Sequence, residues 1–170
     1  MDVKEALTIA IGYEHQVRDH YSLGAEQILD PKGKRVFETL AKEEQGHVAY
    51  LESRLLEWTR TGAIQPPELR TILPPPEWVA QAKERFEQGQ EKDLPVNLEL
   101  DLLKVALDLE RKTSAFYEEL VNTLPGGDRA MFSRFLEIEQ GHVLIVQAEI
   151  DALAGHGHWF DFMEFQLEAG

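Results

Sequence analysis

The five-residue stretch Glu-Gln-Gly-His-Val occurs twice in this chain, at Glu44–Val48 and again at Glu139–Val143. Each copy places a Glu three residues before a His. On a helix, positions i and i+3 are neighbours on one face, so Glu44 would lie beside His47 in the first copy. Because a carboxylate and an imidazole one turn apart can bind the same metal ion, the repeat predicts a helical protein organised around two such pairs.

This motif is part of a longer duplication. The two halves of the chain share further residues at matching spacing. The shared residues are Ala10-Ile11-x-x-Glu14 with Tyr21, and Ala106-Leu107-x-x-Glu110 with Tyr117. Apolar residues recur around them at helical spacing. The chain therefore reads as two copies of a helical hairpin.

The predicted fold class is all-α, in a single domain over residues 1–170. Its parts are a helical hairpin (3–60), a crossover with a short helix (61–97), a second hairpin (98–154) and an aromatic tail (155–170). The predicted helices are 3–24 or 3–29, 31–60, 77–88 ended by Gly89, 98–124, and a last one capped by Asp128 that runs to 154. Two such hairpins bury their apolar stripes against each other as a four-helix bundle.

Acidic and imidazole side chains interrupt the apolar stripes of the four long predicted helices near their middles. They are Glu14, Glu44, His47, Glu110, Glu139 and His142. Four buried carboxylates without counter-charge would strongly destabilise a fold. Two divalent cations would bring four positive charges against them, so we expect these six side chains to bind a pair of metal ions.

The composition excludes several classes of protein. The 170 residues suffice for one domain and include no Cys, which excludes disulfide scaffolds, thiolate zinc sites, iron–sulfur clusters and cysteine nucleophiles. A formal net charge of -14 disfavours nucleic acids and anionic membranes as partners. With no signal-peptide pattern and no membrane-spanning stretch, a soluble cytoplasmic protein is expected.

With these motifs the chain resembles the ferritin-like superfamily and, within it, the rubrerythrin family, over roughly residues 3–154. The resemblance implies a non-haem di-iron centre that reacts with hydrogen peroxide or dioxygen, in a homodimer. It implies that Glu44 and Glu139 bridge the two ions. Glu14 and Glu110 would each bind one ion, with one His per ion.

The resemblance extends to two tyrosines and fails at two other points. Tyr21 and Tyr117 would donate hydrogen bonds to ligand carboxylates; ordinary core packing is the alternative for both. Rubrerythrins carry a Cys-ligated rubredoxin domain, whereas this chain has no Cys, so its electrons would come from a separate donor protein. They also carry an additional Glu where this chain has Thr113, which weakens the assignment of a peroxidase activity.

Alternatives stay open for both the metal and the function. Iron is the expected metal, and manganese or zinc also suit carboxylate and imidazole ligands. Besides a redox enzyme, the sequence allows an iron-binding or storage protein without turnover and a di-iron hydroxylase of an organic substrate. A metal-free helical interaction module is the fourth hypothesis, and chelator-insensitive melting would favour it.

Other polar residues are not expected to bind the metal pair. Glu43 should point outward from its helix, and His15 and His20 should be exposed. A flexible tail is expected to hold His156 and His158. The aromatic residues of that tail would anchor it onto the bundle or onto a dimer partner; they are Trp159, Phe160, Phe162 and Phe165.

Overall fold

The structure, a computed structural model, describes residues 1–65, 68–87 and 97–163, and in these residues the chain forms five α-helices and no β-strand. The helices are α1 (Val3–Gln27), α2 (Pro31–Thr61), α3 (Pro76–Glu87), α4 (Asn97–Thr123) and α5 (Gly126–His156). The all-α prediction is therefore confirmed. Within the described residues, no helix combines the length and the apolarity that a membrane-spanning segment needs.

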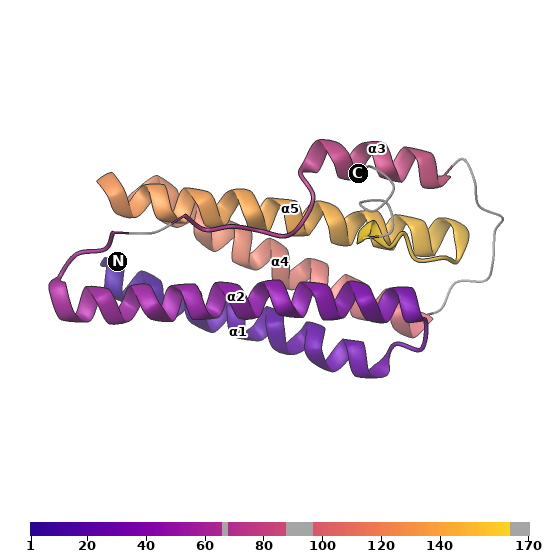
Figure 1. Cartoon of the computed structure of the whole chain (residues 1–170), viewed down its shortest axis with the longest axis horizontal. Helices are drawn as coiled ribbons and strands as arrows, with labels where there is room; N and C mark the ends of the chain where they lie inside the picture. Colours follow the sequence, from indigo (N-terminus) through magenta and orange to yellow (C-terminus); the bar gives the residue numbers. More distant parts are fainter. Residues whose placement is uncertain (66–67, 88–96, 164–170) are drawn as a thin grey trace.

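The four long helices pack as two hairpins, α1 on α2 and α4 on α5, which meet chiefly through α1 and α4. Figure 1 shows that α2 and α4 run in the same direction, so the chain between them returns along the length of the molecule. The described part of this connection passes over α5, where the Arg134 guanidinium donates a hydrogen bond to the carbonyl of Leu69 (3.2 Å). The short helix α3 then packs on α5.

The starts of α2 and α5 follow different rules. Asp30 is the N-cap of α2, and its carboxylate accepts a hydrogen bond from the backbone N–H of Lys32 (2.8 Å), with Pro31 as the first helical residue. The predicted Asp128 cap of the last helix is wrong, because α5 already begins at Gly126. Asp128 lies instead in the first turn, where its negative charge interacts favourably with the helix N-terminus.

Gly24 does not end the first helix, which continues to Gln27. A Cβ atom at Gly24 would lie 2.5 Å from Cε1 of Phe37 on α2, so the glycine permits close packing of the two helices. The other helix boundaries lie within two residues of those predicted. Gly89, the predicted end of the short helix, lies outside the described residues.

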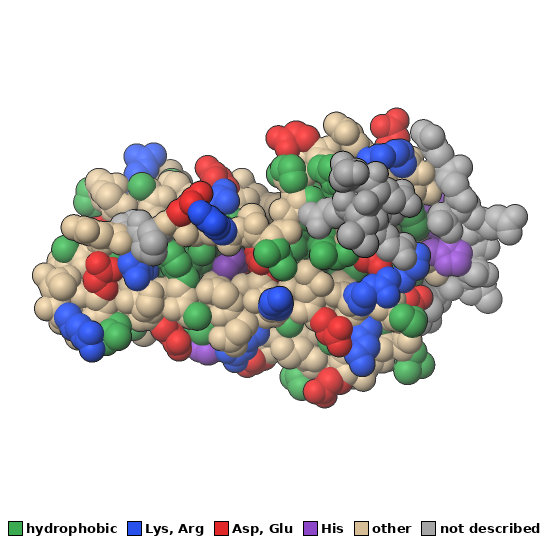
Figure 2. All heavy atoms as spheres, viewed as in Figure 1, with side chains coloured by type: hydrophobic (Ala, Val, Ile, Leu, Met, Phe, Trp, Pro, Cys, Tyr) green, Lys and Arg blue, Asp and Glu red, His purple; other side chains and the backbone are tan. Residues whose placement is uncertain are grey.

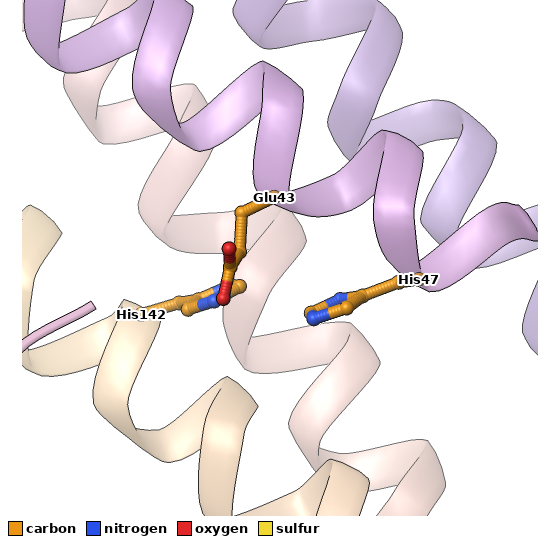
Figure 3. A group of neighbouring side chains, drawn as sticks. All are labelled: Glu43, His47 and His142. Atoms are coloured by element: carbon orange, nitrogen blue, oxygen red, sulfur yellow. The ribbon is translucent and has the colours of Figure 1, made fainter. Parts of the chain in front are cut away.

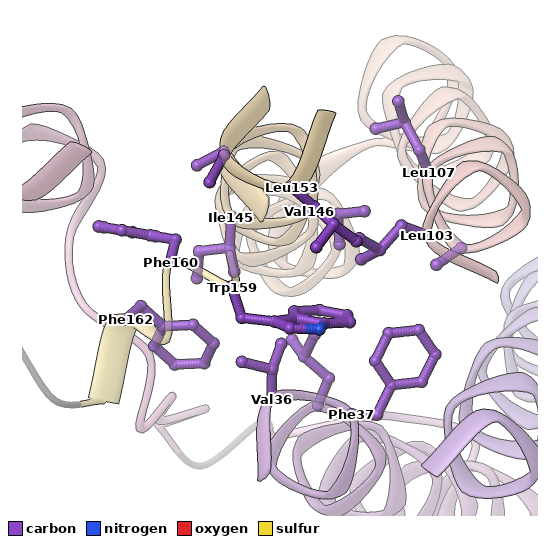
Figure 4. Packing of buried hydrophobic residues seen from close by; sticks show 14 of the residues in the cluster. Val36, Phe37, Leu103, Leu107, Ile145, Val146, Leu153, Trp159, Phe160 and Phe162 are labelled. Atoms are coloured by element: carbon purple, nitrogen blue, oxygen red, sulfur yellow. The ribbon is translucent and has the colours of Figure 1, made fainter. Parts of the chain in front are cut away.

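Buried apolar side chains form two clusters, one on each side of the middle of the long helices. The first includes Val36, Phe37, Leu103, Val146, Leu153 and Trp159 (Figure 4). The second includes Leu7, Leu51, Tyr117, Leu120, Phe132 and Phe135. Along each long helix, the acidic or imidazole residues predicted as ligands lie between the two clusters.

The described aromatic residues of the tail pack on the helices of their own chain. The buried ones belong to the first cluster; they are Trp159, Phe160 and Phe162. The indole N–H of Trp159 donates a hydrogen bond to Glu99 (2.8 Å), and the ring lies where a Cβ on Gly33 would come within 2.2 Å of it. Phe165 lies outside the described residues.

Two buried or half-buried side chains of α5 make contacts near its end, Glu149 with the tail and His156 with α3. Oε2 of Glu149 accepts a hydrogen bond from the backbone N–H of Phe160 (2.8 Å), and burial raises the pKa of Glu149 to about 8. His156 is the last residue of α5, and its ring packs edge-on against Phe86 with centroids 5.9 Å apart. Both histidines that were predicted in a flexible tail are half-buried, His156 at the end of α5 and His158 two residues after it.

Candidate metal centre

The six residues singled out in the sequence converge on one level of the molecule, between the two apolar clusters. Their side chains come from all four long helices: Glu14 from α1, Glu44 and His47 from α2, Glu110 from α4, and Glu139 and His142 from α5. None is more than 1% exposed. Helical periodicity explains the convergence, because each interrupts an apolar stripe that the folded chain buries.

The converging side chains form two overlapping groups of four. In each group every residue offers a ligand atom, and these atoms all lie within 4.8 Å of one another. The groups are Glu14, Glu44, His47 and Glu139, and Glu44, Glu110, Glu139 and His142. Each group contains one imidazole, one carboxylate of its own, and two carboxylates shared with the other group.

The two shared carboxylates each direct one oxygen toward each imidazole. Oε2 of Glu44 lies 3.0 Å from Nδ1 of His47, and its Oε1 lies 2.7 Å from Nδ1 of His142. Oε1 of Glu139 lies 3.3 Å from Nδ1 of His47, and its Oε2 lies 3.6 Å from Nδ1 of His142. This is the orientation in which a carboxylate can bridge two cations.

The two unshared carboxylates are oriented by tyrosines of the opposite hairpin. The hydroxyl of Tyr21 on α1 donates a hydrogen bond to Oε1 of Glu110 on α4 (2.5 Å), and Tyr117 on α4 donates one to Oε1 of Glu14 on α1. In both glutamates the other oxygen, Oε2, faces the imidazole of its own group. Each tyrosine therefore leaves one carboxylate oxygen directed inward.

Aromatic packing holds the imidazoles in place. The rings of His47 and His142 are parallel within 4°, with centroids 5.4 Å apart, and Phe135 packs edge-on against His47 at 5.4 Å. Thr113 is buried on α4, where its hydroxyl donates to the carbonyl of Leu109 (3.0 Å). Position 113 of α4 therefore carries a hydroxyl and not a carboxylate.

Burial and mutual repulsion make the metal-free site retain protons. Burial and the charge of Glu44 raise the pKa of Glu14 to about 8, and burial with the charges of Glu14 and Glu44 raises the pKa of Glu139. Burial also opposes charge on Glu44, but the adjacent imidazoles outweigh it and hold its pKa well below the usual range. Although burial disfavours imidazolium, the carboxylates raise the pKa of His47 and of His142.

Several buried atoms of this site have no hydrogen-bond partner among the described residues. They are Oε2 of Glu110, both carboxylate oxygens of Glu139, and Nε2 of His47 and of His142. Buried polar atoms without partners are rare because desolvating them costs free energy. Oxygen and imidazole atoms at this spacing suit divalent transition metals, so the residues present fit a pair of such ions.

Part of the strong acidity of the chain lies inside the molecule. The buried acidic residues are Glu14, Glu43, Glu44, Glu99, Glu110, Glu139, Glu149 and Asp161. On the face shown in Figure 2, acidic and basic side chains are interspersed. The net charge of -14 therefore overstates how acidic the outer surface is.

Three residues that were predicted to be exposed are more buried than expected. Glu43 was predicted to face solvent, which is wrong: it is 7% exposed, because the connection after α2 covers it. Leu40, Glu43 and His47 follow one another at helical spacings of three and four, so the spacing allows an inward position for Glu43 without specifying it. His20 is half-buried, with Nε2 2.8 Å from the carbonyl oxygen of Leu102, and His15 is half-buried too.

Comparisons with known proteins show a fold likeness without a function. No protein-family model matches the chain, and no curated protein matches it. A solved structure described as a hypothetical protein from Pyrococcus furiosus is similar, with a TM-score of 0.58 and 21% identity over 91% of this chain and 92% of that one. The likeness concerns the fold alone and assigns no activity.

Proposed function

We propose that this chain is a ferritin-like four-helix bundle with a long crossover, which holds a dinuclear iron centre of the rubrerythrin type. The proposed activity is the reaction of that centre with hydrogen peroxide or dioxygen. Glu44 and Glu139 would bridge the two ions. The remaining ligands would be Glu14 with His47 for one ion and Glu110 with His142 for the other.

The observation that carries this proposal is the split orientation of the two shared carboxylates. A coincidental cluster of buried acids would have no reason to present one oxygen of Glu44 and one of Glu139 to each imidazole. Four carboxylates against two divalent ions also give a neutral interior, which removes the main cost of their burial.

The protein side chains would bind, orient and shield the centre. A pair of iron ions, when bound, supplies the two electrons that reduce one peroxide molecule. Tyr21 and Tyr117 hold the unshared carboxylates in place and keep a hydroxyl proton next to the site. The apolar clusters on both sides exclude water from it.

The proposal includes partners that the chain does not supply. Without Cys there is no rubredoxin-type centre, so a separate electron-donor protein would reduce the iron after each turnover. We also propose a homodimer, as the family resemblance implies. Where rubrerythrins carry an additional Glu, this chain has the buried Thr113, so α4 would supply one carboxylate, Glu110, to the centre.

Anaerobic loading with ferrous iron tests the proposed function. We expect two Fe(II) ions to bind per chain, and addition of peroxide to oxidise both while consuming one peroxide and two protons and releasing two water molecules. Near-ultraviolet absorption of ferric carboxylate would report the oxidation, and a peroxide assay would report the stoichiometry. An iron-storage protein would bind iron without sustained peroxide turnover when a reductant is supplied.

The control for this experiment is the same protein loaded with Zn(II), which is redox-silent and should show no absorption change. Binding of two ions without reaction with peroxide or dioxygen would contradict the redox assignment while leaving the metal site intact. Failure to bind two ions would contradict the centre itself.

Metal binding should release protons, and affinity should therefore rise with pH. In the metal-free protein the raised pKa values of His47, His142 and Glu14 keep protons on these groups near neutral pH. A metal ion must displace them, so we expect about two or more protons to leave per pair of ions at pH 7. Calorimetric titration with Zn(II) in buffers of different ionisation enthalpy measures this number. A value of zero would contradict the expectation.

A further inference from the structure

Glu43 lies beside the proposed dinuclear centre without belonging to either group of four ligands. Its carboxylate extends from α2 toward the imidazoles of His47 and His142 (Figure 3). The three residues each offer a ligand atom, and these atoms lie within 4.8 Å of one another. The two imidazoles are thus common to the inner groups and to a third group that contains Glu43.

Each imidazole has a second nitrogen for which no short distance to the inner carboxylates is seen. Nδ1 of His47 and of His142 faces the inner carboxylates, whereas Nε2 of both rings is buried without a hydrogen-bond partner. Two metal–ligand bonds of about 2.0–2.2 Å place ligand atoms at most about 4.4 Å apart. Atoms that lie within 4.8 Å of one another therefore need only a small side-chain shift to bind one ion.

Glu43 stands between the inner centre and the outside of the molecule. It is 7% exposed, whereas the inner carboxylates are fully buried. The connection after α2 covers it, and the backbone N–H of Ile72 donates to its carboxylate at 3.2 Å and 3.4 Å. Ile72 itself is 51% exposed, so this covering is a single layer of chain.

A cavity lies against the same covering segment. Its volume is about 440 Å³, and its lining includes Thr71 and Leu73, the two neighbours of Ile72. Ile138 and Gly141 line it as well, and they adjoin Glu139 and His142 in the sequence. The cavity therefore lies next to the segment whose backbone N–H at Ile72 binds Glu43, and next to the turns of α5 that carry Glu139 and His142.

We propose that Glu43, His47 and His142 form a third, outer position for a divalent transition-metal ion, through which ions reach the inner pair. One carboxylate and two imidazoles favour Fe(II), Mn(II) or Zn(II) over the oxygen-preferring Mg(II) and Ca(II). Because the imidazoles are shared, an ion occupies the outer position only transiently, before it moves to an inner position that is still empty. This inference rests on the proposed dinuclear centre.

The test compares metal uptake by the wild-type chain and by Glu43→Gln, with Co(II) as the probe. Glutamine keeps the size of the side chain and one oxygen to accept the Ile72 N–H, so the covering segment should stay in place. We expect both proteins to bind two Co(II) ions at equilibrium with similar affinity. Uptake, followed by stopped-flow visible absorption, should be slower in Glu43→Gln by about tenfold or more, because the first anionic ligand on the route is lost.

The matched control is Glu38→Gln, an exposed glutamate on the same helix, which should take up Co(II) at the wild-type rate. Equal uptake rates for Glu43→Gln and wild type would overturn the proposal. A roughly 10–100-fold weaker equilibrium affinity of Glu43→Gln for Co(II) would also overturn it. Such a loss would indicate that Glu43 only orients the ligand imidazoles. Failure of the wild type to bind two ions would refute the proposed centre instead.

A diffraction experiment locates the outer position directly. Crystals of the wild type soaked in less than one equivalent of Zn(II), so that inner positions stay partly empty, should show a partially occupied anomalous peak beside Glu43 in data collected at the zinc absorption edge. The same soak of Glu43→Gln should show only the inner positions. Absence of the peak beside Glu43 in the wild type would overturn the proposal.

Discussion

Replacing Glu139 by Gln is expected to weaken the binding of both metal ions at once. One oxygen of Glu139 faces each imidazole, so the amide removes an anionic ligand from both groups of four in a single substitution. The loss for each ion should exceed the roughly 10–100-fold that removal of an outer hydrogen-bond partner costs. Calorimetric titration with Zn(II) would measure the two dissociation constants.

The comparison with Glu14→Gln makes this prediction specific. Glu14 belongs to one group only, so its amide should weaken one ion strongly and leave the other near its wild-type affinity. Glu137→Gln, an exposed position two residues before Glu139 on α5, should change neither. Equal effects of Glu139→Gln and Glu14→Gln on the two ions would contradict the bridging role.

The folded state of the Glu139→Gln variant can be checked independently of metal. In the metal-free protein this substitution removes one of four clustered buried carboxylates, whose burial and mutual repulsion oppose folding. We therefore expect metal-free Glu139→Gln to melt at or above the temperature of the metal-free wild type. A loss of metal binding together with such a melting temperature separates a ligand defect from a folding defect.

Removing metal should lower the melting temperature of the wild type by a large amount. Each ion that binds only the folded state adds about 4 kcal/mol when its concentration is about 1,000 times the dissociation constant. Two ions would then add about 8 kcal/mol, which for a chain of 170 residues corresponds to roughly 15–30 °C. Differential scanning calorimetry with excess Zn(II) and with excess chelator measures the difference.

The control for the melting experiment is the Glu44→Ala/Glu139→Ala double variant, which lacks both carboxylates that the two groups share. Its melting temperature should respond little to chelator. If the wild type also melted at one temperature with and without chelator, the dinuclear centre would be wrong. The helical core would then serve an interaction module that needs no metal, the alternative the sequence left open.

The composition of the site could be predicted because helical periodicity is local information. Spacing alone placed Glu44 and His47 on one face of a helix, and the duplication placed Glu139 and His142 at the matching level of the second hairpin. Charge balance then predicted two cations. The spatial result, six residues buried at one level, follows from apolar stripes that are themselves visible in the sequence.

The sequence was less informative where a distant segment decides the environment. The exposure of Glu43 depends on the backbone around Ile72, which reaches it only through the course of the connection after α2. The tail was predicted to anchor on the bundle or on a dimer partner. The contacts that anchor it, the hydrogen bond from Trp159 to Glu99 and the packing of the Trp159 ring over Gly33, join residues far apart in the chain. No local pattern specifies such contacts.

Two predicted helix boundaries were wrong for a different reason. Asp128 satisfies the usual preference for a cap, yet α5 starts two residues earlier, at Gly126. Gly24 is a usual helix breaker, but its lack of a side chain serves the contact with Phe37. In both cases one residue type is compatible with two structural roles, and packing selects between them.

The layer of charged groups between the two apolar clusters has a consequence for how the molecule unfolds. The clusters are joined along each helix by carboxylates and imidazoles whose burial opposes folding when no cation is present. Each end of the molecule can then open without the other, as an independent cooperative unit. With cations in place the same layer becomes a crosslink between four helices, and loss of native structure becomes a single, all-or-none event.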